Sequence, residues 1–569
     1  MEEFSEERVA AAAERAALIN ALQHETDAAV GPIMGPLMAE HPSFRAHADV
    51  VSELVAEAVA AVNAESMTWR RDRLAEIDPD ALAAIDAPAP KSESHALPAL
   101  PDADGPVRMR AAPNPNGPWH IGHARMPAVI GAYRERYDGH FILRFDDTDP
   151  GTKRPDLTAY SAIESDLAYL GVSPDAVVRA SDRMEEYYQH ARQVIDAGGA
   201  YVCGCTAETF SALKNDGEAC PHRGEPIPET HERFAAMIDG AFEAGEAVLR
   251  IRTDIEHANP ALRDFVAFRM IDRPHPRPAA AAYRCWPMLD FQSAVDDHLL
   301  AISHIIRGID LQDSARRQRF IYGYLGWEYP AVLHWGHVNI DAYDVPLSTS
   351  AIAAAIDEGV LSGWDDPRAP TLMSLRRRGI EGAAIVETMV ELGMSTSNVD
   401  LAMSRLYAAN RARVDPSAPR AFLVRDPVQL SVAGLPDQVA VERHPEDATM
   451  GVRTIGVSDA VALEPQDVPE EGARVWLKGA GCVRREDDGL VATGDPIDVV
   501  RSGAVDVVHW APAAGRPVRM ETPEGPTAGV APPPLAQIEE DTVVQFERVG
   551  FARIDAQEPT RTVAYFAHR

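Results

Sequence analysis

Apolar residues in the first part of the chain recur at helical spacing. In residues 1 to about 80, alanine and glutamate dominate, and apolar side chains fall on one helix face, as in Val51, Leu54, Val55, Ala58 and Val59. A proline-rich stretch at 86–105 then has the composition of a linker. These patterns predict a helical module with its linker over residues 1–100.

The next part alternates short apolar segments with helical patterns. Residues 141–145 have the pattern of a strand and residues 158–170 that of a helix. Repeated alternation of this kind indicates a parallel α/β sheet over residues 101–343. Residues 202–284 interrupt it with cysteines, prolines and irregular spacing, so we expect an inserted subdomain there.

Helical spacing returns at 371–413, within a predicted connecting domain at 344–420. From residue 421 to the end, short β-rich runs are separated by Gly, Pro and Asp turns, for example at 422–424, 438–441, 474–477, 505–510 and 542–548. Irregularly spaced runs favour β-barrels over a parallel sheet. The predicted fold class is therefore multidomain α/β plus β.

Composition adds an expectation about the environment. The chain of 569 residues carries a formal net charge of −33, and only four of its 54 Lys and Arg residues are lysine. Such an acidic surface suits high salt, where screening still lets local arginines contact phosphates. We find no apolar run long enough to span a bilayer and no signal-peptide pattern, so we expect a soluble cytoplasmic protein with no membrane contact.

The densest chemical motif lies at residues 108–125. A short strand runs into a Pro/Asn/Gly loop and then into a helix that begins with His-Ile-Gly-His, residues 120–123. Exposed backbone N–H groups and a helix N-terminus suit phosphate binding. Gly122 would let a nucleotide lie close to the backbone, and His120 and His123 can donate hydrogen bonds to phosphate oxygens as charge shifts in a transition state.

This stretch resembles the HIGH region of class I aminoacyl-tRNA synthetases, in the glutamyl/glutaminyl branch. Segments 141–150, 287–298, 303–308 and 363–379 resemble further parts of that branch in the same order, and are similar to its archaeal and eukaryotic glutamyl-tRNA synthetases. The resemblance implies a Rossmann-like catalytic domain with an inserted acceptor-binding subdomain, two C-terminal anticodon-binding β-barrels at 421–569, and ATP with Mg²⁺ as cosubstrate.

The resemblance also implies residue roles. For ATP these are Pro113, Asn116, Gly117, His120, Gly122 and His123, and for the amino acid they are Arg110, Asn114, Asp146 and Arg307. Arg307 resembles the arginine that pairs with the side-chain carboxylate of glutamate, where the glutaminyl branch has an uncharged residue. A buried unpaired guanidinium would penalise neutral glutamine by several kcal/mol. Leu289 stands where glutaminyl enzymes have a tyrosine, which leaves part of the pocket unexplained.

The second class I signature is altered. The family loop, usually Lys-Met-Ser-Lys-Ser, corresponds to Pro-Leu-Ser-Thr-Ser at residues 346–350. Ser348 and Ser350 remain as candidate catalytic residues, while Thr349 replaces the second lysine as a candidate ATP ligand. Hydroxyl groups bring no charge, so Mg²⁺ and the histidines would have to neutralise more of the developing charge.

Two further sets of residues have binding chemistry. Cys203, Cys205, Cys220 and His222 form a C-x-C…C-x-H pattern that matches a tetrahedral structural Zn²⁺ shell, with free cysteines as the alternative. Arg376, Arg377 and Arg378 are candidate tRNA phosphate contacts, with a solvated helix face as the alternative, and Arg316, Arg317 and Arg319 form a second basic group.

Taken together, these features predict ATP-dependent attachment of L-glutamate to tRNA(Glu) through a glutamyl-adenylate, by a monomer. Two alternatives stay open: a glutaminyl-tRNA synthetase, which Arg307 disfavours, and a non-activating tRNA-binding paralogue, which the missing lysines would fit. Whether tRNA(Gln) is also a substrate depends on anticodon contacts that the sequence does not reveal.

Overall fold

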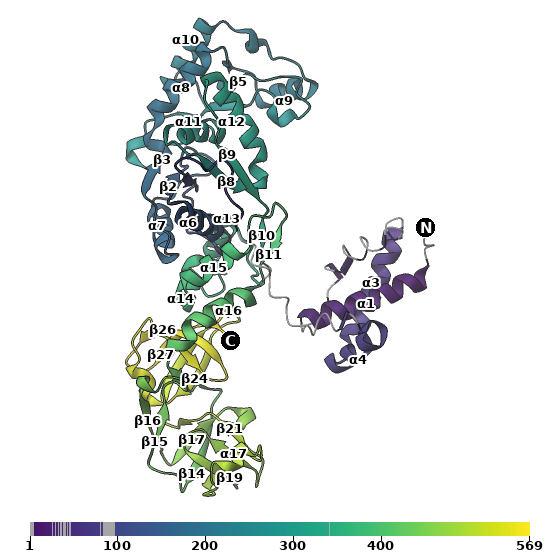
Figure 1. The fold of residues 1–569 in the computed structure, drawn as a ribbon, viewed down its shortest axis with the longest axis vertical. Coiled ribbons are helices and arrows are strands. Elements are labelled where there is room, and N and C mark those ends of the chain that lie inside the picture. The colour runs from purple at the N-terminus through teal and green to yellow at the C-terminus, as the bar shows by residue number, and fades with distance from the viewer. Residues whose placement is uncertain are drawn as a thin grey trace. The chain divides into compact units, whose positions relative to one another are not determined.

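The computed structural model describes residues 5–24, 27–28, 30–31, 33–34, 37, 41, 44, 47–79, 81–82, 97–340 and 342–569. The chain forms two compact units, Met1–Ser94 and His95–Arg569 (Figure 1). Residues 86–96 of the predicted linker lie outside the described residues. No described helix combines the length and the apolar character that a bilayer crossing requires.

The N-terminal unit is helical, as predicted. It contains α1 (Glu6–His24), α3 (Ala48–Asn63) and α4 (Met67–Ile77). The stripe of Val51, Val55, Val59 and Val62 on α3 is buried against apolar residues of α1. Arg70 on α4 is also buried, and its Nε donates to the carbonyls of Val62 in the last turn of α3 and of Glu65 just after it, which fixes α4 against that helix.

A parallel sheet forms the centre of the second unit and confirms the predicted α/β region. β1 (Arg108–Ala111), β2 (His140–Phe145) and β3 (Ala176–Arg179) pair in parallel, as do β8 (His304–Gly308) and β9 (Ala331–Trp335). The N–H of Ser303 donates to the carbonyl of Arg108 over 3.0 Å, so β8 starts beside β1. Alternate residues of β2 enter different cores, since Phe141, Leu143 and Phe145 pack in one cluster and Ile142 in another.

Helices follow the strands of this sheet. α6 (Arg125–Tyr137) comes after β1 and packs on β1 and β2, and α7 (Leu157–Tyr169) comes after β2. α8 (Met184–Asp196) leads into the insertion, and α11 (Leu289–Leu299) and α12 (Gln312–Leu325) flank β8 in the chain. Residue ranges predicted as strand 141–145 and helix 158–170 therefore differ from β2 and α7 by a single residue at the ends.

The interrupted region is a small antiparallel sheet with two helices. β4 (Ala200–Cys203), β5 (Val248–Ile251), β6 (Val266–Met270) and β7 (Cys285–Pro287) lie in that order. α9 (Ala207–Asp216) and α10 (Ile227–Ile238) fall between β4 and β5, with the short 3₁₀ helix η4 (Pro221–Gly224) between them. Figure 1 shows this region at the upper end of the larger unit.

Helices connect the sheet to the C-terminal region. They are α13 (Thr349–Asp357), α14 (Leu372–Arg378), α15 (Gly382–Glu391) and α16 (Met403–Val414). A two-stranded parallel pair, β10 (Val338–Asn339) with β11 (Val399–Asp400), joins this helical part to the end of β9. α15 packs on both α6 and α16, so the connection belongs to the main core.

The C-terminal region consists of two seven-stranded sheets and a hairpin, and the predicted β-rich region is confirmed. One sheet has the order β12-β25-β26-β27-β23-β24-β13, the other the order β21-β18-β19-β20-β14-β17-β22. The strands are β12 (Arg420–Ala421), β13 (Val424–Arg425), β14 (Val428–Ala433), β17 (Ala460–Leu463), β18 (Arg474–Leu477), β19 (Gly481–Glu486), β20 (Gly489–Ala492), β21 (Asp506–Val508), β22 (Ala511–Pro512), β23 (Arg516–Glu521), β24 (Thr527–Ala531), β25 (Val543–Phe546), β26 (Gly550–Gln557) and β27 (Thr562–His568), and α17 (Asp498–Arg501) precedes β21. β15 (Gln438–Glu442) and β16 (Val452–Gly456) form the hairpin.

The predicted strand at 422–424 is wrong in one respect. β12 ends at Ala421 and β13 begins at Val424, so the two residues between them are not in a strand. Phe422 is buried in the core of one sheet and Leu423 in the core of the other. β12 and β13 are the two outer strands of the same sheet, and burial of the residues between them in both cores gave a strand-like apolar pattern.

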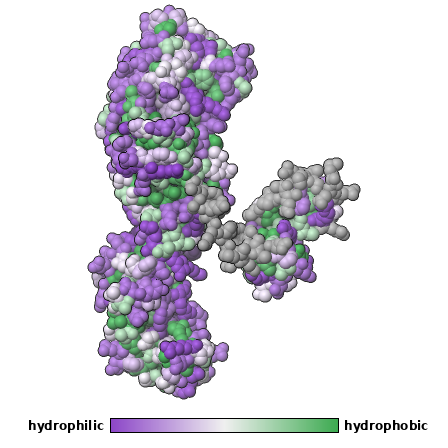
Figure 2. Space-filling view, in the orientation of Figure 1, coloured by the Kyte–Doolittle hydropathy of each residue, from purple (hydrophilic) through white to green (hydrophobic). Residues whose placement is uncertain are grey.

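Hydrophilic residues cover most of the visible face of the larger unit, with smaller apolar patches between them (Figure 2). The distribution agrees with the acidic composition of the chain.

Candidate active site

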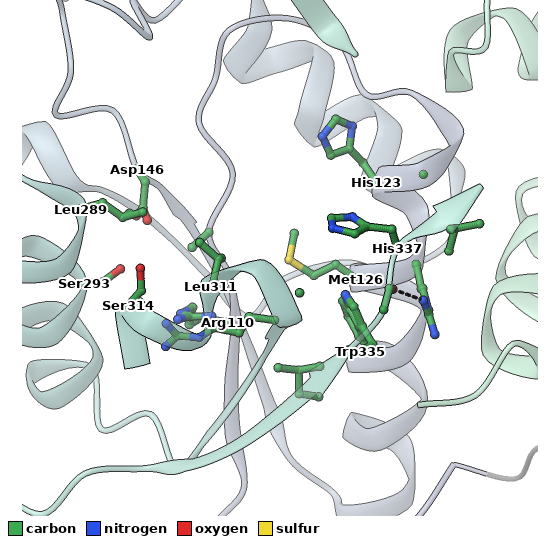
Figure 3. A pocket seen from close by; sticks show the side chains of 18 of the residues that line it. Arg110, His123, Met126, Asp146, Leu289, Ser293, Leu311, Ser314, Trp335 and His337 are labelled. Carbon is green, nitrogen blue, oxygen red and sulfur yellow. Dashed lines mark hydrogen bonds between the residues drawn. The ribbon is translucent and has the colours of Figure 1, made fainter. Parts of the chain in front are cut away.

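A cavity of about 360 Å³ lies at the carboxyl ends of β1, β2, β8 and β9 (Figure 3). Ligands of parallel α/β sheets bind at this edge because the loops after the strands converge there. Six of the predicted site residues line the cavity, namely Arg110, His120, Gly122, His123, Asp146 and Arg307. Pro113, Asn114, Asn116, Gly117, Ser348, Thr349 and Ser350 are not among its lining residues.

Arg110, near the end of β1, is held by a carboxylate behind it. Its Nε and Nη2 donate to the two oxygens of Asp297 over 3.0 and 3.1 Å, and both side chains are buried. Arg144 on β2 donates to the same carboxylate over 2.8 Å. Burial alone would raise the pKa of Asp297, but the charges of Arg110 and Arg144 outweigh it and hold that pKa below its ordinary value.

Asp146 follows β2 and is oriented by the same network. Arg144 donates to both of its oxygens, over 2.6 and 3.2 Å, and Gln292 donates to one of them over 3.1 Å. Arg144 is fully buried and also donates to Ser293 over 2.6 Å. A buried guanidinium with this many partners fixes the position of Asp146 at the cavity wall.

Arg307, at the end of β8, has a different environment. The residue is 7% exposed, and its Nη2 donates to Gln318 over 3.0 Å and to the Tyr329 hydroxyl over 3.3 Å. In the described part of the chain its Nε has no hydrogen-bond partner, and no carboxylate lies within the 4.0 Å of an ion pair. Burial lowers the pKa of Arg307, and the nearby Arg110 adds to the effect. A buried cation without a counterion favours an anionic ligand.

The His-Ile-Gly-His segment is anchored by backbone hydrogen bonds. The N–H groups of Ile121 and Leu372 donate to the carbonyls of Pro370 and Trp119, each over 2.9 Å, which pairs this segment with residues 370–372. His120 precedes the 3₁₀ helix η2 (Ile121–Ala124), and its N–H donates to the Nδ1 of His123 over 3.3 Å. The histidine rings are therefore held in place before any ligand binds.

Both histidines are neutral at pH 7. Burial lowers the pKa of His120 to about 4. Burial, together with the neighbouring His120, lowers the pKa of His123 to about 3, and the ring centroids are 3.7 Å apart. Among the described residues, the buried Nδ1 of His120 has no hydrogen-bond partner. The histidines can donate hydrogen bonds to phosphate oxygens, but they bring no full charge.

The Pro/Asn/Gly loop lies beside the cavity and is fixed there by hydrogen bonds. The N–H of Asp146 donates to the Pro113 carbonyl over 2.9 Å, and the amide of Asn114 donates to the Asp146 carbonyl over 3.0 Å. The N–H of Asn116 donates to the Asn114 carbonyl over 3.0 Å. Thus Asn114 positions the backbone of Asp146 and lies beside the cavity rather than in its wall.

Two glycines allow close contacts. A Cβ on Gly122 would lie 3.1 Å from the His120 ring, and a Cβ on Gly117 would lie 2.5 Å from the methyl group of Thr349 and 3.1 Å from Trp364. The second contact joins the two signature segments directly, since Gly117 precedes the first histidine and Thr349 lies in the altered loop.

The altered loop itself is only partly buried. Ser348 and Ser350 are exposed, Thr349 is half-buried, and α13 begins at Thr349. Leu347 is the residue of 346–350 that lines the cavity. The loop therefore presents hydroxyl groups and an apolar side chain, without any charge.

Some site residues escaped the sequence interpretation, including Arg144, Asp297, Gln292 and Gln318. An arginine inside the apolar run Phe-Ile-Leu-Arg-Phe was the available signal for Arg144, because a charge in a buried strand needs a partner. Asp297 had a weaker signal, since α11 shows no polar face and its residues 290–297 are all buried.

The three arginines of α14 have three different environments. Arg376 is exposed and donates to Ser165 over 3.1 Å. Arg377 pairs with Asp365 and Asp555 over 2.8 and 2.9 Å. Arg378 is 1% exposed and donates to the carbonyls of Phe566 and Ala567. A buried Arg378 does not fit a phosphate contact, because it holds β27 against α14.

The cysteine cluster comes together in space. One ligand atom from each of Cys203, Cys205, Cys220 and His222 lies within 4.8 Å of all the others. The Sγ atoms of Cys203 and Cys220 are 3.8 Å apart, and the Sγ of Cys205 is 3.5 Å from the Nδ1 of His222. Since a Zn–S bond is about 2.3 Å long, a tetrahedral shell places two sulfurs about 3.8 Å apart. The four residues fit such an ion.

Comparison with known proteins agrees with this geometry. The family model described as tRNA synthetases class I (E and Q), catalytic domain, matches residues 106–416, and that described as the anti-codon binding domain of the same class matches residues 418–500. Proteins named glutamate–tRNA ligase from Natronomonas pharaonis and Haloarcula marismortui are 59% and 56% identical over 571 and 579 residues, covering 100% of each chain. One from Methanosarcina acetivorans is 43% identical over 564 residues, covering 98% of each. The chain belongs to the class I (E and Q) family of tRNA synthetases.

Proposed function

We propose that the chain attaches L-glutamate to tRNA(Glu) in two steps. A carboxylate oxygen of glutamate attacks the α-phosphorus of ATP, which forms glutamyl-adenylate and releases pyrophosphate. A hydroxyl group of the terminal tRNA nucleotide then attacks the carbonyl carbon, which forms glutamyl-tRNA and releases AMP. The observation that carries the choice of amino acid is the buried Arg307, a cation in the cavity wall with no carboxylate partner among the described residues.

The charges at this end of the cavity favour an anionic side chain. Arg110 and Arg144 are neutralised by Asp297 and Asp146, which leaves Arg307 as the uncompensated cation. In this arrangement Arg307 receives the side-chain carboxylate of glutamate, Asp146 receives the ammonium group, and Arg110 supports the α-carboxylate. Glutamine would leave the guanidinium desolvated and unpaired, at a cost of several kcal/mol.

The phosphate end of the reaction rests on neutral donors. His120 and His123 donate hydrogen bonds to oxygens of the triphosphate, and Gly122 lets the nucleotide lie against the backbone. Ser348, Thr349 and Ser350 add hydroxyl groups when the loop closes over ATP, with Pro113, Asn116 and Gly117 shaping the loop beneath. Mg²⁺, which comes with ATP, supplies the positive charge that the missing lysines do not.

The other parts of the chain hold tRNA in this proposal. The insertion at 202–284 receives the acceptor end and the two C-terminal sheets receive the anticodon region, within a division into 1–100, 101–343, 344–420 and 421–569. Arg376, exposed on α14, remains a candidate phosphate contact. We further propose a cytoplasmic monomer, with tRNA(Gln) as a second candidate substrate.

Aminoacylation with purified tRNA(Glu) and tRNA(Gln), each assayed with glutamate and with glutamine, tests the proposal. We expect glutamate to be attached to tRNA(Glu). The reaction of glutamate with tRNA(Gln) shows whether the enzyme charges one tRNA or both. Attachment of glutamine would identify a glutaminyl enzyme. ATP–pyrophosphate exchange in the presence of tRNA tests activation, and exchange at background would identify a non-activating tRNA-binding protein.

We also propose that Cys203, Cys205, Cys220 and His222 bind a structural zinc ion, supported by their spacing in the sequence and by the distances between their ligand atoms. Elemental analysis of the purified protein should find about one equivalent of zinc. Cys220→Ser should lose it, whereas Cys482→Ser, a buried cysteine outside the cluster, should keep it. Less than half an equivalent in fresh wild-type protein would contradict the assignment.

A further inference from the structure

Arg453 is a buried cation without hydrogen bonds at the junction of the two C-terminal sheets. It lies on β16, is 6% exposed, and none of its three guanidinium nitrogens has a hydrogen-bond partner among the described residues. Its guanidinium carbon lies 4.4 Å from the centre of the Phe422 ring. Arginine stays protonated in proteins, so five N–H donors are left unused in a desolvated place.

The nearest acid does not neutralise this charge fully. A carboxylate oxygen of Glu547 lies 3.8 Å from Arg453, beyond hydrogen-bond distance. Lys478 contacts the same carboxylate closely, and the Nε2 of His509 is 3.6 Å from it. One negative charge is therefore shared, and it lies closer to Lys478 than to Arg453.

A small cavity adjoins Arg453. It has a volume of about 10 Å³ and is lined by Arg420, Arg443, Arg453 and Phe422, with apolar residues Ala421, Pro532, Pro534, Leu535 and Ile538 completing the wall. Three arginines and no acidic residue line it. Arg420 has its own ion pair with Asp415 over 2.7 Å, so the excess charge comes from Arg443 and Arg453.

We propose that this cavity binds a monatomic halide ion, chloride under ordinary conditions. The volume is about that of one water-sized sphere, which favours a monatomic ion over sulfate, phosphate or a carboxylate. A water molecule would fit, but it accepts only about two hydrogen bonds and brings no charge to balance a buried guanidinium. The net charge of −33 repels anions from the protein as a whole, so a halide can be held only where arginines gather locally.

The bound ion would tie separate parts of the C-terminal region together. Arg443 and Arg453 belong to the β15–β16 hairpin, whereas Pro534 and Leu535 belong to the 3₁₀ helix η11 (Pro533–Gln537) of the β24–β25 connection. β16 packs on η11 in the structure. A halide in the cavity would stabilise this contact, so chloride should raise the stability of the C-terminal region specifically.

Diffraction from crystals of the full chain grown or soaked in bromide tests the site directly. We expect an anomalous difference peak in the cavity, in contact with the guanidinium of Arg453. A featureless anomalous map, with a water molecule only in the cavity, would overturn the proposal. This experiment uses the wild-type protein, so it stands even where a variant fails to fold.

Thermal unfolding gives a second test in solution. Replacing potassium acetate by potassium chloride at constant ionic strength should raise the unfolding midpoint of the C-terminal region by about 2–4 °C. Arg453→Met keeps an unbranched apolar side chain, removes the charge and should abolish that rise. Arg501→Met, at an exposed arginine that pairs with Asp498, should keep it. An equal chloride effect in wild type and Arg453→Met would contradict the site.

Discussion

The two ends of the active-site cavity are built on different electrostatic principles. At the end proposed for the amino acid, Arg110, Arg144, Asp146 and Asp297 form a buried ion-pair network, and Arg307 remains uncompensated. At the end proposed for the nucleotide, His120 and His123 are neutral, and the loop that usually brings lysines brings hydroxyl groups. A further buried cation, Arg125, lines the cavity two residues after His123 and donates to two backbone carbonyls, so the two ends differ in their ion pairing rather than in charge alone.

The difference follows from what each substrate brings. An amino acid arrives without counterions, so its selection depends on fixed charges in a low-dielectric site. ATP arrives with Mg²⁺, which neutralises much of the triphosphate charge by itself. The nucleotide end then has to orient ATP and donate hydrogen bonds to it more than it has to supply charge. Its few donors must therefore be held rigidly. The paired segments 119–121 and 370–372 supply that rigidity.

Removing the charge of Arg307 should have the largest effect and tests the charged end. Arg307→Gln should lower kcat/KM for glutamate about 10²–10⁴-fold, because a bound side-chain carboxylate then lacks its cation. The unfolding temperature should stay unchanged or rise, since an unpaired buried cation costs stability. Arg134→Gln, at an arginine paired with Asp175 outside the cavity, is the matched control and should leave kcat/KM nearly unchanged.

A smaller loss is expected at the neutral end. His120→Ala should lower kcat of ATP–pyrophosphate exchange about 10²–10³-fold, the usual cost of removing one donor to transition-state charge. KM for glutamate should change little, because the ring lies at the other end of the cavity. His190→Ala, at a histidine outside the cavity, is the control. A loss confined to KM would contradict the proposed role.

The sequence predicted site residues where a motif is continuous, and missed those that only the fold brings together. His120 and His123 lie within four residues of each other, so their chemistry was visible. Asp297 is 187 residues from Arg110, and its carboxylate became a partner only because the fold brings the C-terminal part of α11 to the side chain of Arg110 on β1. The same holds for Gln318 and Tyr329, which reach Arg307 from α12 and the turn after it.

Elements were predictable where an apolar pattern runs through one whole element. The apolar run of β2 was predicted as a strand to within one residue, and the apolar stripe of α3 falls within the predicted helical module. The segment at 422–424 failed, because Phe422 and Leu423 enter different cores and so mimic a continuous apolar strand. The burial of Arg378 could not be predicted either, because a run of three arginines does not show which side chain is buried.

The pH dependence of the enzyme tests the neutrality of the histidines. Their folded-state pKa values, about 4 and about 3, lie below the ordinary 6.5, so neither should titrate near pH 6.5. Between the folded-state pKa values and 6.5, these histidines bind more protons in the unfolded chain than in the folded protein. The free energy of unfolding should therefore fall as pH decreases from 6.5 toward 4. We expect the pH profile of kcat for exchange to show no inflection near pH 6.5 that depends on His120. An inflection in the wild type that disappears in His120→Ala is the contrary result. Such an inflection would mean that a charged histidine takes part.

The smallest effect is expected for the hydroxyl group of Thr349. Thr349→Val keeps the methyl group that lies against Gly117 and removes only the hydroxyl, so kcat of exchange should fall by no more than about threefold, near the net value of one hydrogen bond. Gly117→Ala is the informative counterpart, because its new Cβ would collide with that methyl group and displace the loop. A larger loss in Gly117→Ala than in Thr349→Val would show that the loop acts through its position. The reverse order would mean that Thr349 supplies chemistry of its own, and the nucleotide end would depend on more than the two histidines.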